Sequence, residues 1–154
     1  MITGNRWSMH FFPVYIIIAT LLTSWFLGFT PLLIPALYST MSLLTFLIYA
    51  WDKSAARKGN SRIAEVTLHW LSLLCGWPGA IIAQQLLRHK TVKADFRGLF
   101  WITVVMNCIA LLLIHTDQGV PYLNSAVSSL QALVTELATD TEQQRLMLGL
   151  LVFR

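Results

Sequence analysis

Long uncharged apolar segments alternate with short polar ones along the chain. Residues 7–51 contain no Asp, Glu, Lys or Arg. A membrane-spanning helix needs about 20 apolar residues, so this stretch is long enough for two. Its Gly-Phe-Thr-Pro sequence at residues 28–31 favours a turn. The pattern therefore predicts one span over residues 11–29 and a second over residues 32–51.

The next apolar segment, residues 66–87, is ambiguous because a Gly-Trp-Pro-Gly sequence interrupts it at residues 76–79. Proline is common in transmembrane helices, so the segment is compatible with a kinked helix that crosses the membrane. The break is equally compatible with two half-helices that enter the membrane and return. Such a re-entrant hairpin requires burial of its broken backbone in protein, and Gly79 and Ala83, four residues apart, would form a close-packing face for it. Both alternatives stay open at this stage.

Three further segments complete the pattern. Residues 99–115 predict another span, and residues 124–139 predict an amphipathic helix. Residues 146–153 are apolar but too short to cross a membrane. The predicted first span exceeds the roughly 7–15 residues of a signal-peptide core and no A-x-A site follows it, so we interpret it as an uncleaved anchor. The apolar face of the amphipathic helix has helical spacing and comprises Val127, Leu130, Leu133, Val134 and Leu137.

The composition agrees with a membrane location. Hydrophobic residues make up 56% of the 154 residues and charged residues only 12%, against about 25% charged in soluble domains. We predict an all-α integral membrane protein with three or four transmembrane helices. A helical membrane domain over residues 1–115 would be followed by an amphipathic tail over residues 116–154. The net charge of +4 is concentrated beside apolar segments, which fits a membrane surface, and direct nucleic-acid binding is not expected.

The positive charges lie in two loops. Eight of the eleven Lys and Arg residues fall in residues 52–65 and 88–98, on either side of the interrupted segment. Positive loops normally stay on the cytoplasmic side of a membrane. A crossing segment would send one of these loops to the other side, whereas a hairpin would keep both in the cytoplasm. Residues 116–144 contain acidic residues and no Lys or Arg, which favours the hairpin with the tail outside.

Convergent cations in these loops suit a phosphate or another anionic group. Alternatively, these cations only determine the orientation of the protein in the membrane, as most Lys and Arg residues beside transmembrane helices do. Asp52 and Glu65 are expected to hold the loops in register by pairing with some of the cations. In a hairpin Glu65 and Arg88 would be close enough to pair, but in a crossing helix they would be about 34 Å apart. The candidate anion-binding residues are Lys53, Arg62, Arg88, His89, Lys90 and Lys93.

A few residues suggest chemistry or local structure. Ser61 is a candidate N-cap for the helix that follows the first loop. His69 or His89 would serve as an acid–base group, oriented by Glu65, although we favour a structural role for His69. Gln84 would return to the depth of His69 in a hairpin. No zinc-type His or Cys spacing, P-loop, G-x-G-x-x-G or G-x-S-x-G motif occurs in the sequence, so no metal site and no cofactor are expected.

Several of these residues together resemble the domain-of-unknown-function 1294 family, which consists of small bacterial membrane proteins. The resemblance covers about residues 43–115. Ala64 stands where the family usually has Pro, and Cys75 stands where it often has Gly. Some members carry an amino-terminal cold-shock domain, which these 154 residues do not contain. The matching residues are Tyr49-Ala50-Trp51-Asp52-Lys53, Ala56, Arg62-Ile63-Ala64-Glu65, Leu68-His69, Gly76-Trp77-Pro78-Gly79-Ala80, Arg88-His89-Lys90, Lys93 and Phe96.

The resemblance implies a multi-pass protein of the bacterial inner membrane and adds no substrate. We favour a non-enzymatic module whose basic loops bind anionic lipid headgroups or an acidic partner. One alternative is a small membrane enzyme that acts on a lipid or lipid-linked phosphate. Another is an accessory or scaffold subunit of a membrane complex, which would dock through the amphipathic tail.

Overall fold

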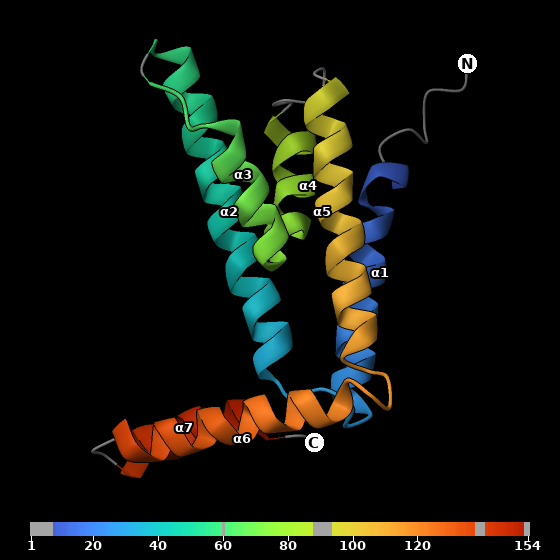
Figure 1. Cartoon of the computed structure of the whole chain (residues 1–154). Coiled ribbons are helices and arrows are strands. Elements are labelled where there is room, and N and C mark those ends of the chain that lie inside the picture. The colour runs from blue at the N-terminus through green and yellow to red at the C-terminus, as the bar shows by residue number, and fades with distance from the viewer. Residues whose placement is uncertain (1–7, 60, 88–93, 138–140, 153–154) are drawn as a thin grey trace. The chain divides into compact units, whose positions relative to one another are not determined.

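The computed structural model describes residues 8–59, 61–87, 94–137 and 141–152, and over these residues all regular structure is helical (Figure 1). The expected all-α class is therefore confirmed. The elements are α1 (Ser8–Phe26), α2 (Leu33–Arg57), α3 (Glu65–Leu71), the π-helical segment η1 (Ser72–Gly76), α4 (Trp77–Leu87), α5 (Ala94–Leu113), α6 (Val120–Leu137) and α7 (Thr141–Leu151).

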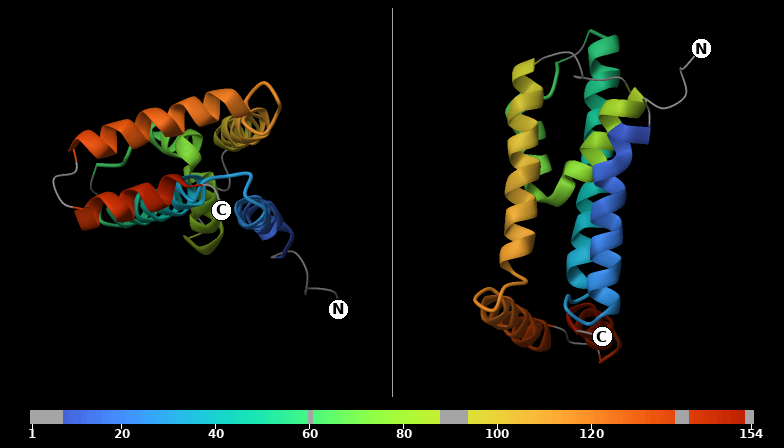
Figure 2. Two further views of the ribbon diagram at one scale, coloured as in Figure 1. Left: turned by 90° about the horizontal axis from the view of Figure 1, so that it is seen from below. Right: turned by 90° about the vertical axis from the view of Figure 1, so that its right-hand side faces the viewer.

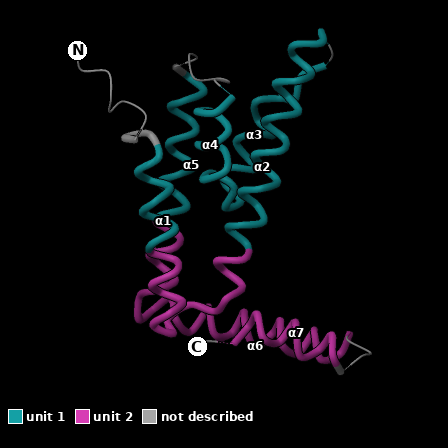
Figure 3. The backbone as a smooth tube through the Cα atoms, turned by 180° about the vertical axis from the view of Figure 1, so that it is seen from behind, with its two compact units in different colours: residues 1–19, 37–108 teal, residues 20–36, 109–154 magenta. Residues whose placement is uncertain are grey.

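The helices form two compact units, which Figure 3 distinguishes by colour. Unit 1 comprises the chain up to Ala19 together with Leu37–Cys108. Unit 2 comprises Thr20–Ala36 and Ile109–Arg154. The candidate site residues of the sequence fall in unit 1, and each unit is described by itself.

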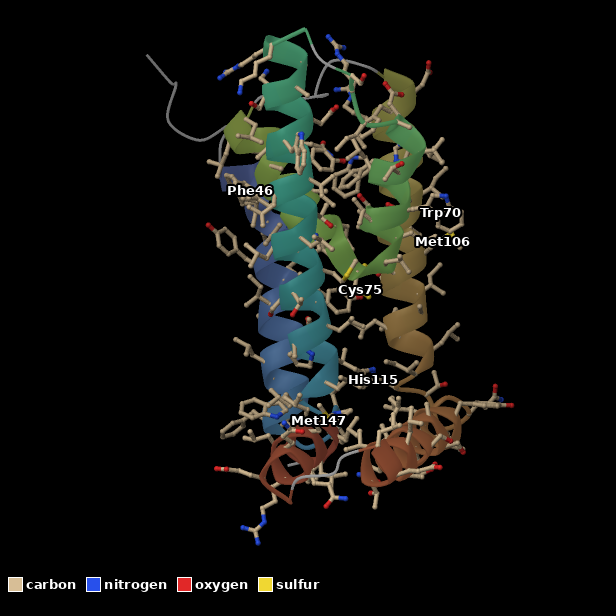
Figure 4. The ribbon with its side chains drawn as sticks, turned by 90° about the vertical axis from the view of Figure 1, so that its left-hand side faces the viewer. Phe46, Trp70, Cys75, Met106, His115 and Met147 are labelled. Carbon is tan, nitrogen blue, oxygen red and sulfur yellow. The ribbon has the colours of Figure 1, made fainter. Side chains whose placement is uncertain are left out.

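Three helical stretches are long and apolar enough to cross a membrane by length and composition: Leu33–Arg57, Glu65–Leu87 and Asp95–Leu113. Large apolar side chains on these helices point away from their neighbours. Leu47, Trp70 and Met106 are each more than half exposed, and Figure 4 shows the last two directed outward. Hydrocarbon chains would cover such a surface without the free-energy cost that water imposes. These features are those of a membrane protein.

The stretch Glu65–Leu87 is not one continuous helix. Leu74 (φ −83°, ψ 45°) and Cys75 (φ 68°, ψ 4°) leave the helical region of backbone space. The chain reverses direction there, so that α3 and α4 both lead from the turn toward the same end of unit 1 and diverge from each other (Figures 1 and 2). Cys75 lies at the turn (Figure 4).

Contacts with α2 show the reversal independently. A Cβ atom at Gly76 would lie 2.0 Å from Thr45 Oγ1, and one at Gly79 would lie 1.8 Å from the carbonyl oxygen of Ser42. The turn is therefore level with the middle of α2. Tyr49, four residues beyond Thr45 and so about one helical turn further along α2, lies near both Ser72 before the turn and Gln84 after it.

Since the segments before and after the turn reach the same level of α2, residues 66–87 form a helical hairpin, as the re-entrant alternative requires. A single kinked helix that continues in one direction is wrong for this segment. The expected close-packing role of Gly79 and Ala83 is confirmed, because Gly79 meets the α2 backbone and Ala83 is 0% exposed. Helices approach this closely where small residues replace larger ones.

The broken backbone of the turn is satisfied by α5. Asn107 Nδ2 lies 2.8 Å from the carbonyl oxygen of Leu73, 3.4 Å from that of Ser72 and 3.0 Å from that of Thr103. Tyr38 in α2 donates its hydroxyl hydrogen to Asn107 Oδ1 at 3.3 Å. Because water does not reach lipid-facing backbone, this amide supplies what the interrupted helix lacks.

The helices on either side of the first basic loop differ from the sequence prediction. α2 extends into residues 52–57, and the next helix begins later than an N-cap at Ser61 would predict. α2 continues six residues beyond Trp51, to Arg57, and Gly59 follows with φ +70°, a conformation that glycine commonly adopts just after a helix. α3 begins at Glu65 with Ala64 as its N-cap residue and no side-chain cap. The expected N-cap role of Ser61 is wrong, because the non-helical residue that directly precedes α3 is Ala64 (φ −59°, ψ 138°).

Other boundaries shift by a few residues. α5 begins at Ala94, five residues before the predicted start, because the apolar pattern gives no signal for its polar first turn. α6 begins at Val120, with Pro121 in its first turn, where proline's missing N–H costs nothing. α7 and α6 are linked near their connection, where Gln144 Nε2 donates to the carbonyl oxygen of Thr135 at 3.2 Å.

Candidate functional site

The predicted site residues that the structure describes belong to the end of α2, to the loop after it and to α3, at one end of unit 1. Asp52 is completely buried, and its Oδ1 accepts the backbone N–H of Ile63 at 2.9 Å. This bond ties the end of the first basic loop to α2, eleven residues earlier in the chain. A hydrogen bond to a carboxylate is stronger than one between neutral groups. Asp52 thus fixes the end of the loop through a backbone N–H group, and its expected pairing with a cation stays a prediction.

His69 lies inside the same end of the unit. It is 8% exposed, and its ring centroid is 4.4 Å from that of Phe96 in the first turn of α5. Phe96 is 1% exposed. This packing joins the hairpin to the helix that follows the second basic loop. It favours the structural role for His69 over an acid–base role, because ring packing limits the room for a substrate beside the imidazole.

Polar side chains continue from Asp52 toward the hairpin turn. Thr45, Tyr49 and Asp52 are spaced by four and three residues and are all fully buried, so they form one polar face of α2 against the hairpin. Tyr49 lies near Ser72 and Gln84. Gln84 thus returns to the depth of the first half of the hairpin, as expected for the re-entrant alternative.

Two of the predicted anion-binding residues are described by the structure, and both are near Asp52 in the sequence. Lys53 is half-buried, whereas Arg62 is exposed. Lys53 lies in the last part of α2, and Arg62 lies in the loop between α2 and α3. Glu65, in the first turn of α3, is half-buried, and its carboxylate there is favoured by the helix dipole.

The second basic loop contributes fewer described residues. Arg97 is exposed on α5. The remaining predicted anion-binding residues, Arg88, His89, Lys90 and Lys93, lie outside the described residues. The predicted pairing of Glu65 with Arg88 therefore stays a prediction. The flanking helices do place the two ends of this loop, after Leu87 and before Ala94, at the end of unit 1 that carries Asp52 (Figure 1).

Sequence reasoning missed Asn107 and Tyr38, which complete the hairpin turn. A single amide in an otherwise apolar α5 was the available signal, because polar groups at membrane depth usually have a specific partner. What could not be read from the sequence was the identity of that partner. The carbonyl groups of Ser72 and Leu73 become acceptors only when the helix breaks.

A second polar cluster, also missed, lies within unit 2. His115 Nε2 is 2.8 Å from Thr30 Oγ1 and 3.0 Å from Ser24 Oγ, and the two hydroxyl groups are themselves hydrogen-bonded. His115 Nδ1 is 2.7 Å from the carbonyl oxygen of Leu111. A hydrogen on Nδ1 would satisfy that carbonyl and leave Nε2 to accept from the hydroxyl groups.

Hydroxyl groups beside a histidine ring also occur in hydrolase active sites, where they serve as nucleophile and base, but the surroundings of this cluster differ from such a site. Ser24 lies in the last turn of α1, and His115 lies just beyond the end of α5. Helix C-termini present carbonyl groups and partial negative charge. An oxyanion would need the opposite arrangement of donors. The cluster is therefore better suited to joining the α1–α2 turn to the end of α5.

The described residues contain no group of three or more His, Cys, Asp and Glu side chains placed to hold a metal ion. Cys75 and Cys108 are both free thiols and half-buried. Their positions in the hairpin turn and in α5 suit small, partly buried side chains that contribute to packing.

Residues 42–96 match a family model described as "Protein of unknown function (DUF1294)". The match confirms the resemblance over the second half of α2, the whole hairpin and the first residues of α5. No curated protein and no solved structure matches the chain significantly. The matched residues contain Asp52, His69 and the hairpin glycines, whereas Asn107 and Tyr38 lie outside them.

Proposed function

We propose that the DUF1294 segment of this chain, residues 42–96, is a non-enzymatic membrane module whose basic end binds anionic lipid headgroups. The observation that carries the proposal is the re-entrant hairpin. It returns the chain to the level of Tyr49, so that α4 ends and α5 begins at the end of unit 1 where α2 ends (Figure 1), which would bring the two cation-rich loops to the same end. A lipid phosphate at that end would meet cations from both loops.

The location of this end follows from the charge rule. Loops rich in Lys and Arg stay in the cytoplasm, and the hairpin allows both loops to obey the rule. We accordingly place the basic end at the cytoplasmic face of a bacterial inner membrane. Each cation near an anionic membrane surface contributes about 1 kcal/mol to the attraction.

Asp52 and Glu65 would act as positioning residues in this module. The Asp52 carboxylate already holds Ile63 at 2.9 Å, next to Arg62 in the chain. Losing this bond would release the loop that carries Arg62 and weaken headgroup binding indirectly. The buried side chain of Asp52, at 0% exposure, would not contact the lipid itself.

Lipid retention by the purified protein tests the proposal. The protein is held in a neutral detergent, and bound phosphatidylglycerol and phosphatidylcholine with identical acyl chains are counted by native mass spectrometry. The test variant is Arg88→Gln/Lys90→Gln/Lys93→Gln, with Lys53→Gln/Arg62→Gln as a second. Each removed cation should weaken phosphatidylglycerol binding about fivefold, given about 1 kcal/mol per charge.

Arg145→Gln provides the matched control, because Arg145 is an exposed cation of α7 in unit 2. It should leave lipid retention unchanged. Equal preference for phosphatidylglycerol in wild type and in both loop variants would overturn the headgroup proposal. A loop-dependent interaction with an acidic protein but not with lipid would instead support an acidic partner.

A further inference from the structure

The apolar face of α6 is only partly covered within unit 2. Val127 is buried, and Leu123 and Val134 on the same side of the helix are half-buried. The rest of the face carries large apolar side chains that remain between 40% and 79% exposed. At helical spacing they form one stripe along α6. The exposed stripe comprises Tyr122, Leu130, Leu133 and Leu137.

A tight turn fixes where α6 begins relative to the end of α5. Thr116 Oγ1 donates to the carbonyl oxygen of Leu113 at 2.7 Å and accepts the backbone N–H of Gly119 at 3.1 Å. A Cβ atom at Gly119 would lie 1.8 Å from the same carbonyl oxygen. The 19 residues of Asp95–Leu113 extend about 28 Å, close to the thickness of the hydrocarbon core. When this helix crosses a membrane, α6 therefore begins at the boundary of the bilayer.

α6 does not continue the direction of α5. The last turn of α5, residues 109–113, belongs to unit 2 together with α6, and α6 runs crosswise to this turn in the views of Figures 1 and 2. A helix that lies crosswise to the end of a membrane-spanning helix follows the membrane surface. This orientation allows one side of α6 to meet the acyl chains while the opposite side meets water.

The other side chains of α6 favour lipid over a protein partner as the cover of the exposed stripe. Glu136 is the single charged residue of the helix. Three hydroxyl groups on the polar side, those of Ser128, Ser129 and Thr135, donate to carbonyl oxygens of the helix itself. Protein interfaces are enriched in Arg and aromatic residues, whereas α6 has no Arg and one aromatic residue, Tyr122. Tyr122 lies in the first turn, beside the end of α5, and tyrosine is typical of the membrane–water boundary.

We propose that α6 is an interfacial helix that lies in the plane of the bilayer at the end of α5 and inserts its exposed stripe between the acyl chains. Such a helix is held by the apolar area that it buries and by the attraction of its cations to anionic lipids. α6 contains no Lys or Arg, so apolar burial alone holds it. Its attachment therefore depends on how loosely the acyl chains are packed and not on headgroup charge. The inference is independent of the headgroup binding proposed for unit 1.

Spin labels on the full chain in liposomes measure the insertion of α6. Leu133→Cys and Ser128→Cys are made separately in a background carrying Cys75→Gly and Cys108→Ala, which removes both native thiols. Oxygen concentrates among the acyl chains, whereas a nickel chelate stays in water. The label at Leu133→Cys should collide mainly with oxygen, and the label at Ser128→Cys mainly with nickel. The proposal is overturned if both labels collide mainly with nickel. It is also overturned if the label at Leu133→Cys is shielded from both reagents, which would indicate cover by a second copy of the chain.

Lipid composition and a second substitution separate acyl packing from charge. Dioleoyl phosphatidylcholine packs more loosely than its palmitoyl-oleoyl counterpart, so the fraction of Leu133→Cys labels in water should be about twofold lower or less in the dioleoyl lipid. Phosphatidylglycerol with the same chains should leave this fraction unchanged. Adding Leu137→Ser should raise it about tenfold, the effect of exposing one leucine side chain, whereas Ala132→Ser on the polar side should not change it. Stronger attachment to phosphatidylglycerol, or equal effects of the two serine substitutions, would overturn the proposal.

Discussion

At the residue scale, the hairpin turn depends on an unusual backbone conformation at Cys75. Its φ of 68° lies in the left-handed region, and among the described non-glycine residues Cys75 alone has a positive φ. An L-residue with a Cβ atom pays about 1–2 kcal/mol to adopt this conformation. Glycine, which the resemblance to the family places at this position, avoids that cost.

Replacing Cys75 by glycine should therefore stabilise the protein. We expect Cys75→Gly to raise the free energy of unfolding by about 1 kcal/mol, because relief of the left-handed strain exceeds the added entropy of the unfolded chain. Denaturant or thermal unfolding in detergent measures the change. Cys108→Gly is the control, because Cys108 lies within α5 and glycine in a helix interior costs about 1 kcal/mol. Destabilisation by both variants to the same extent would contradict a strained turn.

The side chain of Asn107 satisfies the backbone carbonyl groups that the hairpin turn leaves without helical partners. Its Nδ2 faces the carbonyl oxygens of Ser72 and Leu73 at 3.4 and 2.8 Å, which the break in the helix leaves without their usual donors. Its Oδ1 accepts from Tyr38 at 3.3 Å. The amide thus connects α2, the turn and α5, and it does so with groups that the surrounding hydrocarbon could not replace.

At the element scale, α4 packs closely on α2 because Gly79 has no side chain and lets the two backbones approach each other. A Cβ atom at Gly79 would lie 1.8 Å from the Ser42 carbonyl oxygen and 2.7 Å from its Cα atom. These are backbone atoms, which cannot rotate aside as a flexible side chain can. The spacing between α4 and α2 is consequently set by Gly79.

Gly79→Ala should separate the two helices and destabilise unit 1. Overpacking of a close interface typically costs about 1–3 kcal/mol, and we expect a loss in this range from the free energy of unfolding. Gly149→Ala is the matched control, because a Cβ atom there meets nothing within 4 Å and Gly149 lies in α7. That variant should be neutral or stabilising by up to about 1 kcal/mol. Equal effects of the two variants in unfolding experiments would show that α4 does not pack on α2 at Gly79.

At the scale of the whole molecule, the reversal of residues 66–87 determines which aqueous compartment each basic loop faces. A hairpin predicts one compartment for both loops, whereas a crossing helix predicts two. The two arrangements share the same composition and the same apolar length, so only positions of residues in the two loops distinguish them in a membrane.

Cysteine labelling in a bacterial inner membrane tests this orientation. Lys58→Cys and Lys93→Cys are made separately in a background carrying Cys75→Gly and Cys108→Ala, which removes both native thiols. A membrane-impermeant maleimide should label neither variant in intact spheroplasts and both in inverted vesicles, because positive loops stay cytoplasmic. Labelling of the two positions from opposite sides would contradict both the hairpin in the membrane and the shared headgroup site.

Much of the fold could be predicted from the sequence because it depends on local patterns. Apolar length predicts the spans α2 and α5, and glycine with proline marks the α1–α2 turn, where Gly28 indeed has φ +79°. Helix starts were less predictable. α3 begins at Glu65 rather than after Ser61, and the backbone N–H of Ile63, which precedes it, is bound by a carboxylate eleven residues away in the chain.

The sequence by itself determined that this is a helical membrane protein with two cation-rich loops, since charge and hydrophobicity are properties of the residues. Only the tertiary structure decided that the segment between the loops turns back. That choice depends on distant groups, namely the Ser42 backbone that meets Gly79 and the Asn107 amide that meets Leu73. A break at glycine and proline permits either direction. Packing and hydrogen bonding in a medium without water select the one in which the freed backbone groups find partners.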